Sequence, residues 1–152
     1  MFSKEEAALL RKEFWTSFGK SFPRKWLLYN TKIKGVSLKF VADTKKAMIC
    51  LDLEHSDELM NLLYYDQLLS LKSLLETELP EIIYDDAYEL ENGKIIHRIY
   101  VPFDKKFNIH NKNTWRACYE FFVEKMSILE GFFYEYEEVI KNVQFLITYF
   151  IN

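Results

Sequence analysis

The sequence predicts an α+β domain of two layers, in which three helices cover one face of a four-stranded, mainly antiparallel sheet. Two pairs of alternating segments have the pattern of β-hairpins, and an apolar helical segment joins them. Further helical segments precede and follow, which gives the order α-ββ-α-ββ-α. At 152 residues, 49% of them hydrophobic and only four of them Gly, residues 1–152 can form a single domain around one core.

The first helix is predicted from a capping box in residues 3–6, where Ser3 caps the helix and Glu6 returns the hydrogen bond. Gly19 is expected to end it. Its inner side is expected to consist of Leu10, Phe14, Trp15 and Phe18. Residues 21–31 follow as a linker that is aromatic enough to pack on the body of the domain.

The segments 33–42 and 47–54 alternate as strands. Requiring both apolar faces to meet one core pairs Ala42 with Ala47 and leaves a four-residue turn at 43–46. The opposite face then carries Ser37, Lys39, Cys50 and Asp52. Because that face is polar, we expect it to be solvated.

The sequence predicts a central helix over residues 57–79, with Ser56 and Asp57 offering acceptors to its first amides and Pro80 ending it. At 100° per residue, one broad apolar stripe comprises Met60, Leu63, Tyr64, Leu68, Leu71, Leu74, Leu75 and Leu79. A second apolar patch comprises Leu59, Leu62, Tyr65 and Leu69. A helix that is apolar on both sides is expected to lie between the sheet and another helix.

The second hairpin joins residues 81–91 to 94–103 through Asn92-Gly93, the signal of a two-residue type I′ turn. That turn pairs Tyr88 with His97, and Pro102 is expected to end the last strand or to lie at an edge.

Asn113 or Thr114 is expected to cap the last helix. Its apolar stripe comprises Trp115, Tyr119, Phe122, Met126, Leu129, Phe133, Tyr136 and Ile140. Three aromatic residues lie off this stripe: Phe121, Phe132 and Tyr134. The apolar tail 143–152 is strand-like and either adds a strand or buries in a neighbouring chain. This surplus of apolar surface predicts a homodimer.

Cysteine usage and hydropathy indicate a cytoplasmic protein without a membrane segment. Cys50 and Cys118 lack metal-ligand spacing and are expected to be reduced thiols. The polar N-terminus is unlike a signal peptide, and no uncharged apolar run reaches the length that spans a bilayer.

Charge is distributed unevenly along the chain. Residues 1–50 carry eleven Lys/Arg and four Asp/Glu, whereas residues 51–92 carry one and twelve. Such a basic lobe indicates a nucleic-acid surface, or a segment that lies beside the acidic one within the monomer or across a dimer. The candidate nucleic-acid-binding residues are Arg11, Lys12, Lys20, Arg24, Lys25, Trp26, Lys32, Lys34, Lys45 and Lys46.

Two smaller groups carry possible chemistry. The second hairpin is expected to bring together a polar cluster of Asp86, Tyr88, His97 and Arg98. In it, His97 is a hydrogen-bonded, half-buried residue or a general acid–base group. Asp52 and Glu54, with Lys39 on the paired strand, are weak candidates for the metal site of a nuclease-like hydrolase. No motif predicts a cofactor.

Several aromatic and turn motifs together resemble an uncharacterised bacterial family, a domain of unknown function. They are residues 14–19, 26–32, 36–40, 92–94 and 98–99, and Trp115. The resemblance covers roughly residues 3–140, and the tail after Glu138 departs from it. It implies a domain that stands alone or follows a predicted restriction-like nuclease domain, with no catalytic residues to carry over.

The sequence therefore favours a non-catalytic binding or accessory module that contacts nucleic acid or an acidic protein through its basic N-terminal lobe. The alternatives are a structural homodimeric assembly protein and a metal-dependent hydrolase.

Overall fold

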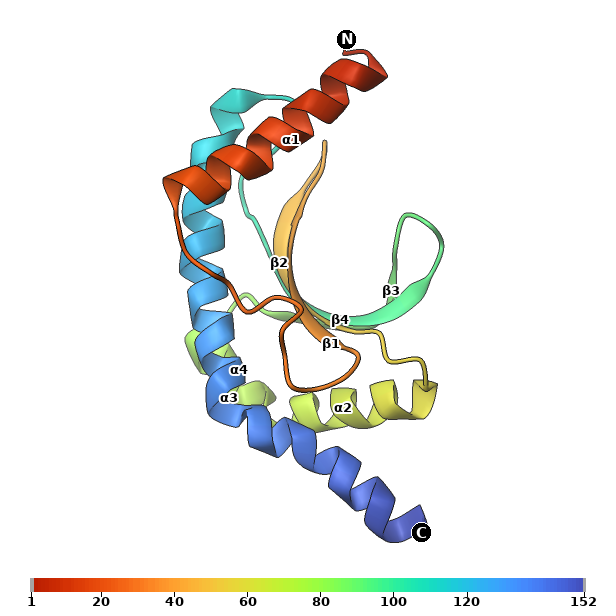
Figure 1. Ribbon diagram of the computed structural model, residues 1–152. Coiled ribbons are helices and arrows are strands. Elements are labelled where there is room, and N and C mark those ends of the chain that lie inside the picture. The colour runs from red at the N-terminus through yellow and green to blue at the C-terminus, as the bar shows by residue number, and fades with distance from the viewer. Residues whose placement is uncertain (1, 152) are drawn as a thin grey trace.

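The computed structural model describes residues 2–151, with side chains through residue 143, and shows one antiparallel sheet with helices packed on one of its faces (Figure 1). The elements are α1 (Lys4–Ser21), β1 (Val36–Ala42), β2 (Ala47–Leu53), α2 (Glu58–Ser70), α3 (Lys72–Glu78), β3 (Ile83–Glu89), β4 (Ile95–Pro102), the 3₁₀ helix η1 (Lys112–Thr114) and α4 (Trp115–Ile151). The strand order β1-β2-β4-β3 joins both hairpins into one sheet, which confirms the predicted class. The described residues contain four α-helices in place of the three predicted.

The first hairpin has the predicted register. Ala42 pairs with Ala47 and Leu38 with Leu51. Asp43 organises the turn, because its carboxylate accepts the amides of Lys45 and Lys46 at 2.7 and 2.8 Å. The apolar side chains of both strands consequently meet the helical layer, where Leu38, Ile49 and Leu51 are fully buried.

Helix α1 begins with the predicted capping box at Ser3. Phe14 and Phe18 are buried against α4, and the hydroxyl of Tyr119 donates to the carbonyl of Phe14 at 2.6 Å. The predicted end at Gly19 is wrong, since the helix runs to Ser21. It ends where Pro23 follows Phe22, because a proline pushes the preceding residue out of helical geometry.

The single central helix predicted over residues 57–79 is two helices, α2 and α3, that meet at Leu71. Leu71 leaves helical geometry (φ −98°, ψ 4°) and is itself buried. The change of direction between α2 and α3 (Figure 1) keeps Leu75 and Leu79 in the core, whereas Leu74 of the predicted stripe is 46% exposed. No Gly or Pro lies at this break, so the local sequence alone would continue the helix.

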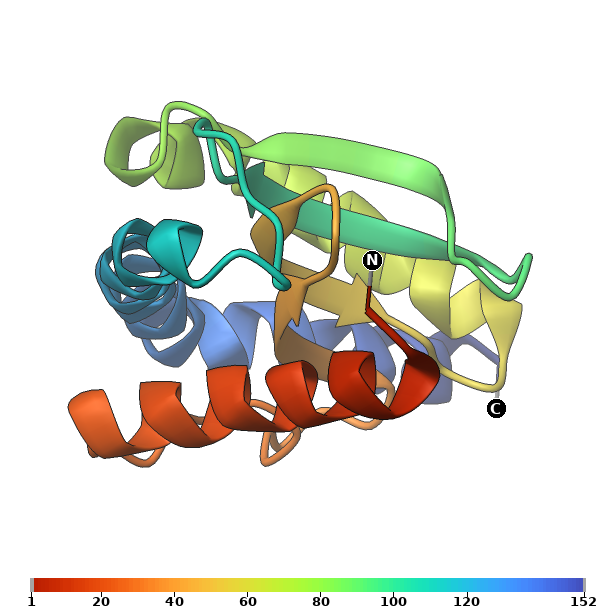
Figure 2. The ribbon, with the colours of Figure 1, turned by 90° about the horizontal axis from the view of Figure 1, so that it is seen from above.

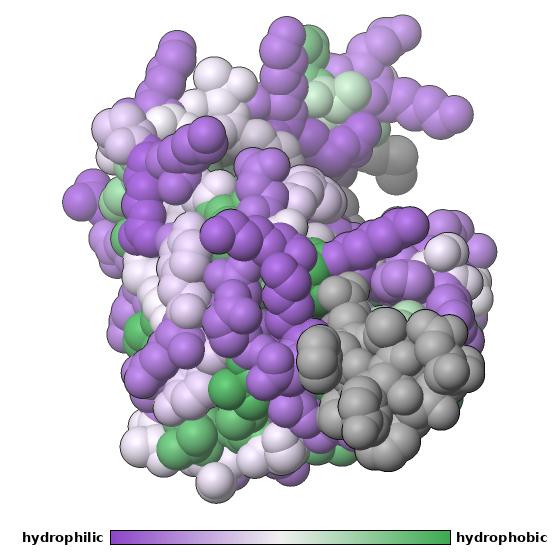
Figure 3. Space-filling view, turned by 60° about the horizontal axis from the view of Figure 1, so that its bottom comes forward, coloured by the Kyte–Doolittle hydropathy of each residue, from purple (hydrophilic) through white to green (hydrophobic). Residues whose placement is uncertain are grey.

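The second apolar patch of the central helix is mostly exposed. Leu59, Leu62 and Leu69 are 38–48% exposed, and of this set Tyr65 alone is buried. The prediction that another helix covers these leucines is wrong, although α4 does reach α2, where Gln67 donates to the carbonyl of Val139 at 2.9 Å. On the coloured part of the face in Figure 3, hydrophobic residues form small patches between hydrophilic ones.

The register predicted for the second hairpin is wrong. Gly93 (φ +87°) donates to the carbonyl of Leu90, and the Leu90 amide donates to Lys94, so the loop has three residues rather than two. A bulge between Asp85 and Tyr88 shifts the pairing again. Tyr88 therefore pairs with Ile96 and not with His97. As expected, β4 ends at Pro102.

Helix α4 buries seven of the eight residues of its predicted stripe, with Tyr136 half-buried. The cap predicted at Asn113 or Thr114 is replaced by η1, which Asn111 caps. The tail continues α4 to Ile151, so the alternative of an added strand is wrong. The side chains of residues 144–152, and with them burial of the tail in a neighbour, lie outside the described residues.

The off-stripe aromatics of α4 give little support to a dimer. Phe121 and Phe132 are buried within the chain, and Tyr134 is exposed. The homodimer consequently stays a prediction.

Both cysteines are buried free thiols, as predicted. Burial raises the pKa of the Cys118 thiol to about 12, which makes it unreactive. The described part of the chain contains no helix with the length and hydropathy needed to span a bilayer.

Candidate functional site

The sheet face that turns away from the helices is concave, because the sheet curves strongly between β2 and β3 (Figures 1 and 2). The sequence predicts that this face is solvated, and that prediction is wrong. Its central residues Cys50 and Asp52 are fully buried, and Arg98 is 4% exposed. The charged side chains tolerate burial because they are paired with one another.

The centre of the concave face is an ion pair between Asp52 on β2 and Arg98 on β4. The two residues are register partners, and Arg98 donates from Nε and Nη2 to the two Asp52 oxygens at 2.8 and 2.9 Å. Burial alone lowers the pKa of Arg98, but the hydrogen bonds and the charge of Asp52 outweigh it and hold the pKa above its usual value. This guanidinium is therefore always charged.

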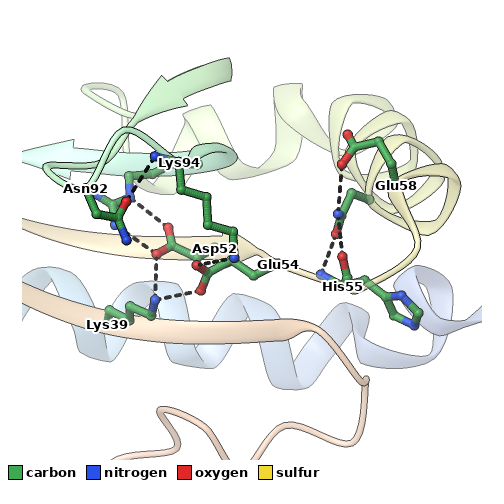
Figure 4. A network of polar contacts seen from close by, with 9 residues as sticks. Lys39, Asp52, Glu54, His55, Glu58, Asn92 and Lys94 are labelled. Carbon is green, nitrogen blue, oxygen red and sulfur yellow. Dashed lines mark hydrogen bonds and ion pairs between the residues drawn. The ribbon is translucent and has the colours of Figure 1, made fainter.

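The pair continues into a chain of alternating charges across the sheet (Figure 4). Lys39 on β1 lies 3.2 Å from Asp52 and 2.7 Å from Glu54, and Lys94 approaches Glu54 at 3.7 Å from the second hairpin. Burial lowers the pKa of Lys39, but the hydrogen bond to Glu54 and the charge of Asp52 together outweigh burial and raise the pKa above its usual value. Lys39 therefore stays protonated. The alternation of positive and negative side chains explains why charged residues on this face can be buried.

Tyr88 joins this face because the bulge in β3 moves it to the side of Arg98. Its ring lies over the Arg98 guanidinium, with 4.4 Å from Cζ to the ring centroid. Its hydroxyl accepts a hydrogen bond from Nζ of Lys46 at 2.9 Å. That bond raises the pKa of Lys46, so the ammonium is retained. The β1–β2 turn and the second hairpin are thus linked across the hollow.

A cavity of about 510 Å³ opens above these residues. This size is within the range of sites for small ligands. The charged and aromatic residues of its lining come from α1, the β1–β2 turn and the second hairpin. They are Arg11, Asp43, Lys46, Tyr88, Glu89, Glu91 and Arg98. We call this cavity the groove.

Of the ten predicted nucleic-acid-binding residues, the structure brings Arg11 and Lys46 to the groove, with Lys45 beside them in the turn. Lys32 and Lys34 precede β1 and therefore lie at the other end of a seven-residue strand, about 20 Å away. Lys12 and Lys20 line a separate cavity on the outer side of α1, and Lys25 is exposed in the linker. The basic residues of the N-terminal lobe therefore do not form one continuous surface; they lie at the groove, on α1, before β1 and in the linker.

Arg24 and Trp26 serve to attach the linker to α4. Arg24 donates from Nη2 to Glu130 at 2.5 Å and lies over the Trp26 ring at 3.9 Å. The other Glu130 oxygen accepts the Leu27 amide at 2.8 Å. Glu130 is 5% exposed, and its role cannot be recognised in the sequence because it looks like one more charge on a helix.

The predicted polar cluster is divided between two faces. Tyr88 and Arg98 lie on the concave face, Asp86 is exposed at the bulge, and His97 points to the helical layer. There His97 Nε2 lies 2.9 Å from Glu58 Oε1 and its ring contacts Tyr65. This contact links α2 to β4, and the predicted pairing of His97 with Tyr88 is wrong.

The His97–Glu58 contact makes stability depend on pH. The hydrogen bond to His97 lowers the pKa of Glu58 from 4.5. A carboxyl whose pKa is lower in the folded state stabilises the fold above its unfolded pKa, and this contribution is lost as pH falls through the folded pKa. We expect Glu58→Gln to lower the melting temperature at pH 7 and to have a smaller effect as the pH falls below 4.5, measured by circular dichroism. Glu78→Gln, an exposed change on α3, is the control.

The candidate metal ligands Asp52 and Glu54 do converge with Lys39, as alternation predicts. Both Asp52 oxygens are, however, engaged by Arg98 and Lys39. Among the described residues, no group of three His, Cys, Asp or Glu side chains is arranged to hold a metal ion. The geometry therefore favours a charge network over a hydrolytic centre.

The sequence profile of a family described as a domain of unknown function, DUF4268, matches residues 10–137. Searches of curated proteins and of solved structures give no match. The matched range includes every residue that lines the groove.

Proposed function

Because the chain belongs to the DUF4268 family, a domain of unknown function, we propose its function from the groove itself: a non-catalytic module that binds nucleic acid. One observation carries the proposal. Arg11 and Lys46, from segments far apart in the sequence, line one cavity together with Arg98 and an aromatic ring. Cationic side chains bind phosphates, and an adjacent aromatic ring contacts unpaired bases.

The charges that would meet phosphate are available. Among the described side chains, neither Arg11 nor Lys46 has a carboxylate within 4.0 Å, whereas Arg24 and Lys39 are ion-paired. Arg11 and Lys46 are also exposed. Phosphate contacts made by such residues displace counterions, so the affinity should depend strongly on salt.

Reversal of the two groove charges tests this function. We expect Arg11→Glu/Lys46→Glu to weaken binding of a labelled single strand about tenfold, since two phosphate contacts become repulsive. Fluorescence anisotropy between about 50 and 200 mM NaCl should show the salt slope falling by about two.

The matched control is Lys72→Glu/Lys141→Glu, which makes the same change in net charge on α3 and α4 in the helical layer. Equal losses in the two double variants would mean that binding follows net charge and not the groove. Absence of binding by the unaltered protein at low salt would remove the proposal.

A further inference from the structure

One side of α2 is left open by the rest of the chain. The inner side packs into the core, where Tyr64 and Leu68 are fully buried. An adjacent side meets α4, where Gln67 donates to the carbonyl of Val139. The open side consists of the exposed residues of the helix, which are Glu58, Leu59, Leu62, Asp66, Leu69 and Ser70. Half of these residues are leucines.

The leucines of the open side have the spacing of a contact between two helices. Leu59, Leu62, Asp66 and Leu69 follow one another at intervals of three, four and three residues, which is the a/d pattern of a coiled coil. At 100° per residue they fall within about 80° of arc and extend over about 15 Å of the helix. The three leucines are 47%, 48% and 38% exposed. A single exposed leucine would need no explanation, whereas three on one stripe form a surface that fits a second helix. We call these four residues the seam.

Asp66 determines which kind of helix fits the seam. It lies between Leu62 and Leu69, so a docked helix would cover its carboxylate. Among the described side chains, no Lys, Arg or His nitrogen lies within 4.0 Å of this carboxylate, and the nearby Lys72 is ion-paired with Glu76 at 3.6 Å. A carboxylate that becomes buried needs a partner, so the docked helix has to supply a Lys or Arg opposite Asp66.

The charge around the seam also favours a basic partner. Helix α2 contains no Lys or Arg, and residues 51–92 carry twelve Asp/Glu and one Lys. A second copy of this chain that presented the same face would supply no cation. Parallel packing of two copies would place Asp66 against Asp66, and antiparallel packing about the middle of the seam would place it against Leu62. The seam therefore suits a different chain.

We propose that the seam docks an amphipathic helix of another protein, with apolar residues at its a and d positions, a Lys or Arg opposite Asp66 and basic residues along its flanks. The three leucines supply the apolar contact, and Asp66 sets the register of the two helices. The acidic surroundings select a basic helix over an acidic one. The seam lies in the helical layer, on the other face of the sheet from the groove, so this interaction is independent of nucleic-acid binding.

A labelled synthetic helix tests the docking. The probe is a peptide of about three heptads with Leu at a and d, Lys at its central a position and Lys or Arg at e and g, and a second peptide has Glu at the central a position. We expect the full chain to bind the Lys peptide with a dissociation constant below about 100 μM, and about tenfold more tightly than the Glu peptide. Fluorescence anisotropy measures both constants.

A change within the seam is compared with a matched change outside it. Leu62→Ser should weaken binding of the Lys peptide about tenfold, because it removes apolar contact at the middle of the seam. Leu74→Ser is the control and should leave the affinity unchanged, since Leu74 is 46% exposed against 48% for Leu62 but lies on α3. Both leucines are exposed, so circular dichroism should show that both variants fold.

Reversal of the Asp66 charge tests the register. Asp66→Lys should reverse the preference, so that the Glu peptide binds about tenfold more tightly than the Lys peptide. Glu78→Lys makes the same change in net charge on α3 and should leave the preference as it is.

Three results would overturn the inference: no binding of the Lys peptide up to about 100 μM, equal losses in Leu62→Ser and Leu74→Ser, or a preference that Asp66→Lys does not reverse. Sedimentation of the chain alone distinguishes another protein from a second copy. Self-association that Leu62→Ser abolishes and Leu74→Ser preserves would assign the seam to a second copy, and the proposal would then be wrong.

Discussion

Asp52→Ala is expected to lower the free energy of unfolding by about 3–5 kcal/mol. The substitution leaves the Arg98 guanidinium, 4% exposed and held on two Asp52 oxygens, as a buried charge without its carboxylate. Lys39 retains Glu54, so the loss falls on Arg98. Urea unfolding followed by fluorescence measures the change.

Two comparisons isolate the cause. Glu54→Ala removes a carboxylate that is 24% exposed and should cost no more than about 1 kcal/mol. Asp52→Val/Arg98→Met removes both charges together and should recover most of the loss, because an apolar pair of similar volume can replace a buried ion pair. A loss below about 1 kcal/mol in Asp52→Ala would contradict the burial of this pair.

Gly35→Ala is expected to cost about 3 kcal/mol, because two penalties combine. Gly35 has φ +83°, a backbone conformation that residues other than glycine rarely adopt. A Cβ there would also lie 2.6 Å from the backbone Cα of His55. Backbone cannot rotate away as a side chain can, and the Gly35 carbonyl already accepts the Glu54 amide at 2.7 Å.

Gly93→Ala separates the two penalties. Gly93 has nearly the same φ, +87°, but a Cβ at this position would meet nothing within 4 Å. Only the conformational penalty remains, about 1 kcal/mol. Thermal unfolding of the two variants should therefore differ clearly, and equal losses would show that the contact with His55 adds no cost.

The two substitutions differ in how they bear on function, because only the Asp52–Arg98 pair lies at the groove. Arg98 lies beneath Tyr88 and lines the cavity. Loss of its partner Asp52 would therefore disturb the lining of the groove. Gly35 lies at the start of β1, at the end away from the turn that carries Lys46. We therefore expect Asp52→Ala to weaken nucleic-acid binding and Gly35→Ala to act through stability alone.

The parts predicted correctly from the sequence depend on neighbours along the chain. The capping box at Ser3 closes within one turn of helix, and the pairing of Ala42 with Ala47 follows from a four-residue turn and a two-residue period. The sequence indicates the candidate site only in fragments. It places Arg11 and Lys46 in one group of candidate residues and Tyr88 and Arg98 in another.

Local periodicity and turn chemistry specify the two hairpins, their union with helices in one α+β domain and the faces of the first hairpin. Three features become visible only in the folded chain: the break of the central helix at Leu71, the bulge that brings Tyr88 to Arg98, and the burial of Asp52 on the polar face. They have one cause in common. Each depends on packing between elements that are distant in the chain, and no local pattern encodes such packing.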